Sequence, residues 1–148
     1  MQEHPVDVIY TSSLKRTKET AQLAFPDRQV QAIADFDERG FGQWEGLTAD
    51  EIEAAFPEVW QAWLEAPFEV TPPEAEVFAD FQTRVWAATE SLLDSTDESI
   101  ALVAHLGVLR LIYQHLVDGE AVFWNIDVPQ GRVLLLEERD QTWQATLL

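Results

Sequence analysis

Hydrophobic and polar residues along this chain alternate between strand-like and helix-like spacing. Short apolar runs typical of buried strands cover residues 6–10, 30–33 and 99–105. Stretches in which apolar residues recur every three or four positions lie between and after these runs and predict helices. Two further runs, 132–138 and 142–148, predict closing strands that pair antiparallel across a short turn. Strands that alternate with helices indicate an α/β fold with helices on both faces of a sheet.

Residues that cap helices set the boundaries of the first three predicted helices. The first helix is expected to open at Ser12 or Ser13 and to carry Arg16 in its first turn. Residues 48–51 fit a capping box, in which a Thr hydroxyl and a Glu carboxylate satisfy each other's backbone amides. Pro57 predicts a break in the helix that follows this box.

Two longer helices complete the predicted framework. One covers 107–117, and Gly119 is expected to act as its C-terminal cap. The other helix carries apolar residues at roughly helical spacing, namely Val77, Phe81, Val85 and Leu92.

At 148 residues the chain is long enough for one domain over 1–148 and too short for two ordinary ones.

Two side chains with useful chemistry follow predicted strands. Arg16 comes soon after strand 6–10, and His105 ends strand 99–105. Ligands on α/β sheets usually lie beyond the carboxyl ends of the strands, so both residues are expected at the same edge. The N-terminus of a helix that also holds an arginine favours an anion. The pattern therefore predicts an anion site at this edge.

Composition narrows the class of anion and the compartment. The net charge of -18 argues against nucleic acid or an anionic membrane surface as a partner, whereas a small phosphorylated metabolite remains compatible with it. With no cysteine, the chain has no disulfide and no thiolate zinc site, which fits a cytoplasmic protein. No run approaches the ~20 apolar residues of a membrane span, and the first residues lack the pattern of a signal peptide.

Three residues could act together on a phosphate. Taken singly, Arg16, Glu38 and His105 are typical of a surface cation, a loop carboxylate and a core histidine. Together they supply a guanidinium that can fork onto a phosphate, a carboxyl group that can pass a proton, and an imidazole that can stabilise charge. These are the parts of metal-free phosphoryl transfer, so no cofactor is expected. His4 and His115 are interpreted as structural or surface residues.

Three motifs resemble those of one known family. TSSLKRTKETA resembles the pattern Ser-x-Leu-x-Arg-Ala-x-x-Thr-Ala of the histidine phosphatase (phosphoglycerate mutase-like) superfamily. DERGFGQWEG is similar to its Glu-x-x-x-Gly-x-Trp-Glu-Gly segment, and VAHLGVLR to its Ser-His-Gly-Gly-Val-Ile-Arg segment. The motifs occur in the family's order, and the resemblance covers nearly the whole chain. The FGQWEG form is similar to small bacterial members such as α-ribazole phosphatases.

The resemblance implies a fold and a role for each site residue. It implies a three-layer, phosphoglycerate mutase-like α/β fold whose mostly parallel sheet includes one antiparallel strand. Arg16 would bind the phosphate, Glu38 would donate a proton and later act as base, and His105 would stabilise the transferring phosphoryl group. Ser12 would lie near the substrate or cap its helix, and Arg39 would contact the rest of the substrate.

Three features depart from the family pattern. No Arg-His-Gly occurs in the chain, although its histidine is the family's phosphorylated nucleophile, and the central first strand that ends in it has no counterpart. Leu106 stands where the family has glycine and is expected to crowd the phosphate. Residues 72–78, PPEAEVF, replace a segment that usually contains Gly-Glu-Ser.

The absent strand leaves three interpretations open. The natural product begins upstream, the sheet closes differently or borrows a strand from a second copy in a homodimer, or the chain is a non-enzymatic phosphate-binding or interaction protein derived from the family. The predicted function is a metal-free phosphomonoesterase for a small phosphorylated metabolite, with α-ribazole phosphate as a candidate and little activity expected from this chain alone. A phosphoglycerate mutase is the second alternative.

Overall fold

The computed structural model of the protein describes residues 6–95 and 99–148. Contacts divide the chain into two compact units, one formed by residues 39–83 and the other by the two flanking segments. His4 lies outside the described residues. Among the helices that are described, none is both long enough and apolar enough to cross a membrane.

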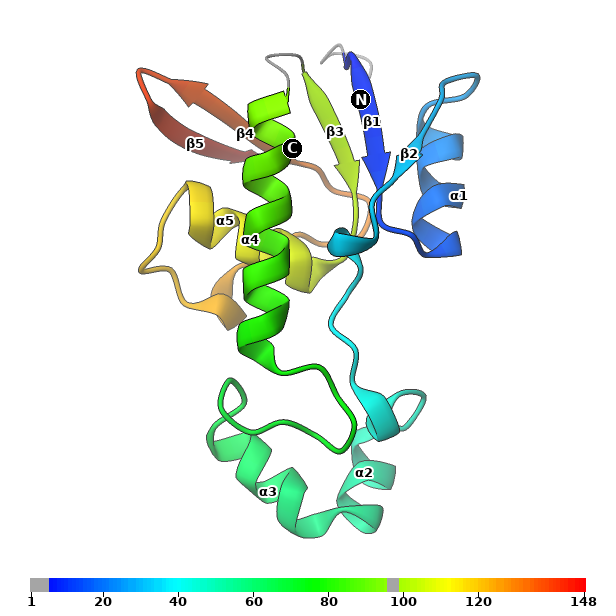
Figure 1. Cartoon of the computed structure of the whole chain (residues 1–148), viewed down its shortest axis with the longest axis vertical. Coiled ribbons are helices and arrows are strands. Elements are labelled where there is room, and N and C mark those ends of the chain that lie inside the picture. Colours follow the sequence, from blue (N-terminus) through cyan, green and yellow to red (C-terminus); the bar gives the residue numbers. More distant parts are fainter. Residues whose placement is uncertain (1–5, 96–98) are drawn as a thin grey trace. The chain divides into compact units, whose positions relative to one another are not determined.

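A parallel sheet of three strands forms the centre of the flanking unit (Figure 1). The middle strand β1 (Val8–Thr11) pairs with β2 (Gln31–Ala32) on one side and β3 (Ile100–Val103) on the other. In the β1–β3 register, Thr11 lies opposite Val103, so the two strands end at the same level. The parallel pairing of β1 with β3 confirms the α/β class predicted from the sequence.

The strand β1 forms because its residues favour an extended chain and bury one face. Val, Ile, Tyr and Thr all have high strand propensity, and the side chains of Ile9 and Thr11 are fully buried. Helix α1 (Lys15–Ala24) packs against β1 and β3. Its Ala21, together with Phe25 beyond its end, joins Ile9 in a small apolar core.

Helix α1 begins later than the sequence predicted. Ser12 N donates to the last carbonyl of β3 at 3.2 Å, so strand-like pairing continues past β1. Ser13 donates from both its backbone and its hydroxyl to the carboxylate of Asp37. These bonds hold the two serines outside the helix, and Leu14, with extended backbone, becomes the N-cap. Arg16 nevertheless remains in the first turn.

The closing strands form a hairpin that is separate from the parallel sheet. β4 (Leu134–Arg139) and β5 (Thr142–Leu147) pair antiparallel, as predicted, across a turn whose two residues have positive φ. The described strands thus form a three-strand parallel sheet and a two-strand hairpin, and no described strand lies between β3 and β4, where the family's first strand was expected to be missing. Consequently β3 is half-buried rather than buried.

The two long helices lie close to their predicted positions. α4 covers Phe78–Ser95 and α5 covers Leu106–Leu116. The predicted cap at Gly119 is wrong, because the C-cap of α5 is Val117, whose N–H bonds to Tyr113 O, and Gly119 does not have positive φ. The described chain also contains three single-turn 3-10 helices, which are η1 (Ala34–Phe36), η2 (Gly42–Trp44) and η3 (Phe123–Asn125).

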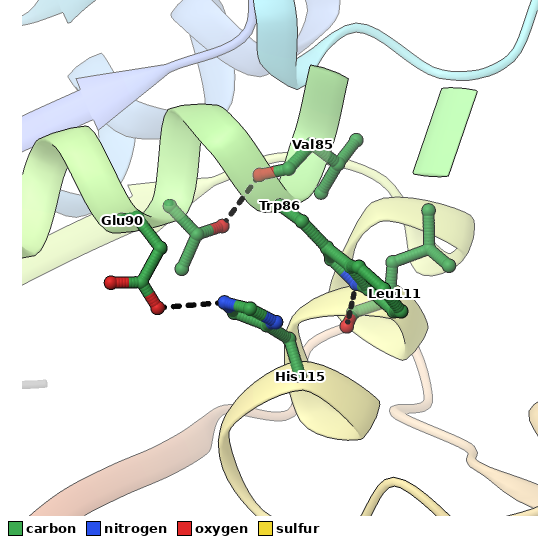
Figure 2. A network of polar contacts seen from close by, with 6 residues as sticks. Val85, Trp86, Glu90, Leu111 and His115 are labelled. Carbon is green, nitrogen blue, oxygen red and sulfur yellow. Dashed lines mark hydrogen bonds and ion pairs between the residues drawn. The ribbon is translucent and has the colours of Figure 1, made fainter. Parts of the chain in front are cut away.

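Polar and aromatic contacts join α4 to α5 (Figure 2). Trp86 Nε1 donates to Leu111 O at 2.9 Å. The imidazole of His115 stacks on the Trp86 indole with ring centroids 5.1 Å apart, and its Nε2 lies 2.7 Å from Glu90 Oε1. His115 thus links two helices, in agreement with its interpretation as a structural residue.

The unit of residues 39–83 contains two short helices and an aromatic cluster. In α2 (Ala49–Ala55), the predicted capping box is confirmed, since Thr48 Oγ1 accepts from Glu51 N and Glu51 Oε1 accepts from Thr48 N. The predicted break is confirmed as well, because α3 (Pro57–Glu65) starts at the proline. The aromatic cluster consists of Trp44, Phe56, Trp60 and Trp63, and the centroids of its contacting rings are 5.7 to 6.5 Å apart.

The burial of Ile9 in the middle strand leads to a stability prediction. We expect Ile9→Ala to lower the free energy of unfolding by about 3 kcal/mol, since a large-to-small change in a closed core loses both transfer energy and packing. Leu23→Ala is the control, because Leu23 in α1 is 83% exposed whereas Ile9 is 0% exposed. Urea unfolding followed by circular dichroism measures both. Equal losses in the two variants would contradict the position of Ile9 in the core.

Candidate functional site

Arg16 and His105 lie together at the carboxyl edge of the parallel sheet. Because β1 and β3 end level with each other, the residues that follow them are neighbours although they are far apart in the sequence. Arg16 Nη2 lies 3.4 Å from His105 Nδ1. His105 is the extended residue that precedes α5, and Arg16 stands in the first turn of α1. The sheet therefore places a guanidinium against an imidazole.

Ser12 contacts the opposite side of the same imidazole. Its Oγ lies 2.9 Å from His105 Nε2 and 2.7 Å from Thr17 Oγ1. All three side chains are buried, with exposed fractions of 0% for Ser12, 4% for Thr17 and 8% for His105. Ser12 does not cap α1 through its side chain, since the contact of its Oγ with the backbone at Leu14 N is long, at 3.4 Å. Thr17 was not singled out from the sequence, since a threonine inside a helix carries no functional signal.

Glu38 reaches the N-terminus of α5 from a distant part of the chain. Its Oε2 accepts from Gly107 N at 3.3 Å, and a carboxylate is favourable at the start of a helix. A side chain on Gly107 would overlap this carboxylate, so the close approach depends on glycine. Leu106 is the first residue of α5 and is half-buried. Its crowding of a phosphate stays a prediction.

Two residues that sequence reasoning missed hold the backbone around Glu38. The carboxylate of Asp37 accepts from Ser13 N at 2.7 Å and from Ser13 Oγ at 2.6 Å. Arg84 donates to the carbonyl of Asp35 at 2.7 Å and to that of Glu38 at 3.3 Å. Asp37 was adjacent to a singled-out residue, but nothing in the sequence marked Arg84. Together they attach the acidic loop to α1 and α4.

The electrostatic environment of His105 favours its neutral form. Burial lowers the pKa of this imidazole, and the positive charge of Arg16 lowers it further. The carboxylates of Glu38 and Asp37 act in the opposite direction and raise it, with Glu38 having the larger effect. The balance leaves the pKa below the ordinary value for histidine. A dianion next to Arg16 would oppose this shift, because it adds negative charge.

Arg39, expected to contact substrate, belongs to the unit of residues 39–83. Its Nε donates to Glu76 O at 2.9 Å, and its guanidinium lies over the rings of Phe41 and Phe78. The side chain is only 6% exposed, and this burial lowers its pKa while Glu76 raises it. These contacts give Arg39 a structural role within its unit. A contact with substrate stays a prediction.

The cluster at the sheet edge combines an anion-binding group with two groups that can exchange protons. Arg16 can present parallel N–H donors to an oxyanion, and Glu38 and His105 can each bind or release a proton. In the part of the chain that the structure describes, no group of His, Asp and Glu residues is arranged to hold a metal ion. The chemistry of Arg16, Glu38 and His105 is suited to an anionic group.

The contact between Gly107 and Glu38 predicts a double-mutant result. We expect Gly107→Ala to destabilise the protein by about 1 kcal/mol, although Ala normally favours a helix over Gly, because the methyl group displaces the Glu38 carboxylate. In a Glu38→Ala background, the same change should be neutral or stabilising. Gly119→Ala is the matched control, as its nearest non-neighbouring atom would lie 3.8 Å away. Equal effects of Gly107→Ala in both backgrounds, measured by urea unfolding, would argue against the contact.

The surroundings of His105 predict how its protonation changes with its neighbours and with pH. In phosphate-free buffer, NMR titration should give a pKa below the ordinary 6.5, raised by Arg16→Ala and lowered by Glu38→Gln. Because the folded pKa is depressed, neutral His105 adds stability that is present above about pH 6.5 and is lost as the pH falls through the folded pKa. The His105→Gln variant should not show this part of the loss of stability at low pH. A wild-type pKa at or above 6.5 would contradict the expected dominance of burial and Arg16 over the two carboxylates.

Comparison with known proteins identifies the family of this fold and site. The model of the histidine phosphatase superfamily (branch 1) matches residues 1–148. The adenosylcobalamin/alpha-ribazole phosphatase of Escherichia coli K12 is 32% identical over 129 residues, which cover 84% of this chain and 64% of that protein. Phosphoserine phosphatase 1 of Hydrogenobacter thermophilus is 29% identical over 143 residues, covering 93% of this chain and 67% of the relative.

Solved structures of similar proteins support the same assignment. An alpha-ribazole-5'-P phosphatase from Escherichia coli K-12 superimposes with a TM-score of 0.90 at 27% identity, over 100% of this chain and 75% of its own. The alpha-ribazole phosphatase of Shigella flexneri gives a TM-score of 0.90 at 26% identity, with the same coverage. The chain spans less than two thirds of the length of the Escherichia coli K12 relative, at 64%. Since the family model matches the whole chain, this protein belongs to the histidine phosphatase superfamily, branch 1.

Proposed function

We propose that this chain binds the phosphate group of a small phosphorylated metabolite at the carboxyl edge of its parallel sheet. The observation that supports this most directly is the approach of Arg16 to His105, within 3.4 Å, at the ends of two adjacent parallel strands. Glu38 accepts a hydrogen bond at the start of α5 and interacts electrostatically with the imidazole of His105. Such a site suits a metal-free phosphomonoesterase of the histidine phosphatase type.

Each side chain has a role that its chemistry allows. Arg16 directs two N–H groups at the phosphate oxygens, a geometry that a lysine cannot provide. As water attacks the phosphorus and the ester P–O bond breaks, Glu38 gives its proton to the oxygen of the leaving alcohol, and the resulting carboxylate takes up the proton that the attacking water loses. His105, once protonated, stabilises the negative charge on the transferring phosphoryl group.

The names of the relatives support a class of substrate. The Escherichia coli and Shigella flexneri relatives are named for α-ribazole phosphate, and others for phosphoserine and for fructose 2,6-bisphosphate. All of these are small phosphate esters. We therefore take α-ribazole phosphate as the first substrate to test, with phosphoserine next.

Turnover by the chain itself should be slow. The resemblance to the family implies a covalent phosphohistidine on an Arg-His-Gly motif, and the chain contains no such motif. Without it, the route that divides one difficult step into two is lost. His105 is a poor substitute, since in-line displacement needs a nucleophile opposite the leaving oxygen. The rival proposal is a phosphate-binding protein without catalytic activity.

Binding of phosphate tests the site independently of turnover. By isothermal titration with inorganic phosphate and with α-ribazole phosphate, we expect Arg16→Ala to weaken binding at least ~10-fold, because charge-assisted hydrogen bonds are lost. Lys15→Ala is the matched control, since it removes a neighbouring cation whose side chain is 90% exposed and pairs only with Glu19 in the described contacts. It should change affinity less than ~2-fold. The absence of binding to the wild-type chain, or equal losses in both variants, would exclude the proposed site.

Hydrolysis of p-nitrophenyl phosphate separates the enzyme from the binding protein. We compare this chain with a fusion in which an apolar strand ending in Arg-His-Gly precedes Val6. Turnover that appears in the fusion, survives a chelator and disappears with Arg16→Ala would support the phosphatase. Phosphate binding without turnover in both forms would support the binding protein. A stoichiometric phosphohistidine in the unfused chain, detected after acid quench, would contradict slow turnover.

A further inference from the structure

The imidazole of His105 lies between two neighbours that act on different nitrogens. On one side is Arg16 Nη2, 3.4 Å from Nδ1. A guanidinium has only N–H donors and no acceptor. A neutral imidazole carries one proton, so the nitrogen that faces Arg16 is favoured as the acceptor. This contact alone indicates that the proton of neutral His105 is on Nε2.

On the Nε2 side of the ring, a backbone carbonyl determines which groups donate and which accept hydrogen bonds. Leu14 O is only an acceptor, and Thr17 Oγ1 lies 2.8 Å from it, so the single hydroxyl proton of Thr17 points to this carbonyl. Thr17 Oγ1 can then only accept from Ser12 Oγ, 2.7 Å away. Once Ser12 has donated its proton there, its oxygen must accept from His105 Nε2 at 2.9 Å. The direction of all three bonds follows from one carbonyl.

We infer that Thr17 and Ser12 form a one-way hydrogen-bond relay that holds neutral His105 in the Nε2–H tautomer, with Nδ1 left as the proton acceptor beside Arg16. Two independent contacts, Arg16 at one nitrogen and the relay at the other, favour the same tautomer. The burial of Ser12, Thr17 and His105 keeps water from replacing the bonds of the relay. Thr17 and Ser12 are positioning residues, since they act through the imidazole.

The relay gives His105 a defined way to respond to an anion, a consequence that rests on the proposed function. A phosphate held by Arg16 faces Nδ1, and uptake of one proton at that atom converts the ring to imidazolium. The Nε2–H bond to Ser12 is the same in both states, so no hydroxyl has to rotate. In the family pattern, the position of Thr17 is alanine. In this chain the additional hydroxyl of Thr17 fixes the direction of the Ser12 bond.

Removal of the Thr17 hydroxyl should weaken the preference of neutral His105 for the Nε2–H tautomer. Without it, Ser12 Oγ has no acceptor at 2.7 Å and can turn its proton toward His105 Nε2. The ring would then carry its proton on Nδ1 in part of the molecules. We expect a tautomer ratio of at least ~10:1 in favour of Nε2–H in the wild type, and a roughly fivefold fall in Thr17→Val, the factor that one neutral hydrogen bond represents.

Long-range 1H–15N correlation of the histidine rings measures this ratio directly, because protonated and unprotonated ring nitrogens resonate in different regions. The full chain contains only three histidines, and His105→Gln assigns the signals of the ring in question. Spectra are recorded in phosphate-free buffer at about pH 8, where the imidazole is neutral. Thr20→Val is the matched control, since the Thr20 hydroxyl on the same helix is exposed and bonds to Arg16 O instead.

The proposal is supported if the wild type and Thr20→Val show protonated Nε2 while Thr17→Val shows a mixture. A wild-type spectrum with protonated Nδ1, or a ratio unchanged in Thr17→Val, would overturn it. If Thr17→Val does not fold, Thr17→Ala, which restores the family residue, takes its place with the same expected result. Adding inorganic phosphate then separates the two proposals: if no proton is taken up at Nδ1, the proposed function loses its support while the relay stands.

Discussion

Parallel pairing of β1 with β3 is the constraint on which the candidate site depends. The register that sets Thr11 opposite Val103 brings Ser12 and His105, 93 residues apart in the sequence, within hydrogen-bond distance. A shift of one residue would turn every side chain of the strand to the other face. It would move Ser12 from the imidazole and Ile9 from the core together, so stability and site geometry rest on the same backbone bonds.

The candidate site presents a positively charged side chain, although the chain as a whole is strongly negative. A net charge of -18 repels anions at long range, yet screening limits this effect to about 8 Å at physiological salt. The charges that act on His105 locally are those of Arg16, which is positive, and of Glu38 and Asp37, which are negative. The fixed bonds of Asp37 to Ser13 and of Glu38 to Gly107 hold these carboxylates to particular partners. Their charge is thereby opposed by backbone N–H groups as well as by Arg16.

Much of this architecture could be predicted from the sequence, because local patterns determine it. The strands around Ile9 and Ala101, the capping box at Thr48 and the break at Pro57 follow from period, capping chemistry and proline geometry. The predictions that were wrong concern features that depend on distant partners. The start of α1, for example, is delayed because Ser12 and Ser13 bond to β3 and Asp37. No local pattern reveals such bonds. The sequence likewise marked Arg16, Glu38 and His105 but missed Thr17 and Arg84, which act only through their neighbours.

The distance in sequence between the two halves of the site determines when it can form during synthesis. β1 and α1 leave the ribosome before β3, and His105 follows them only after about 5 to 20 s at ordinary elongation rates. Until then β1 can pair only with the two residues of β2, because β3 has not yet been made. The nascent chain thus carries a half-covered apolar strand for seconds, and closing so long a loop is slow compared with forming the local helices. Binding of an anion at this site can therefore contribute to folding only after His105 has been made.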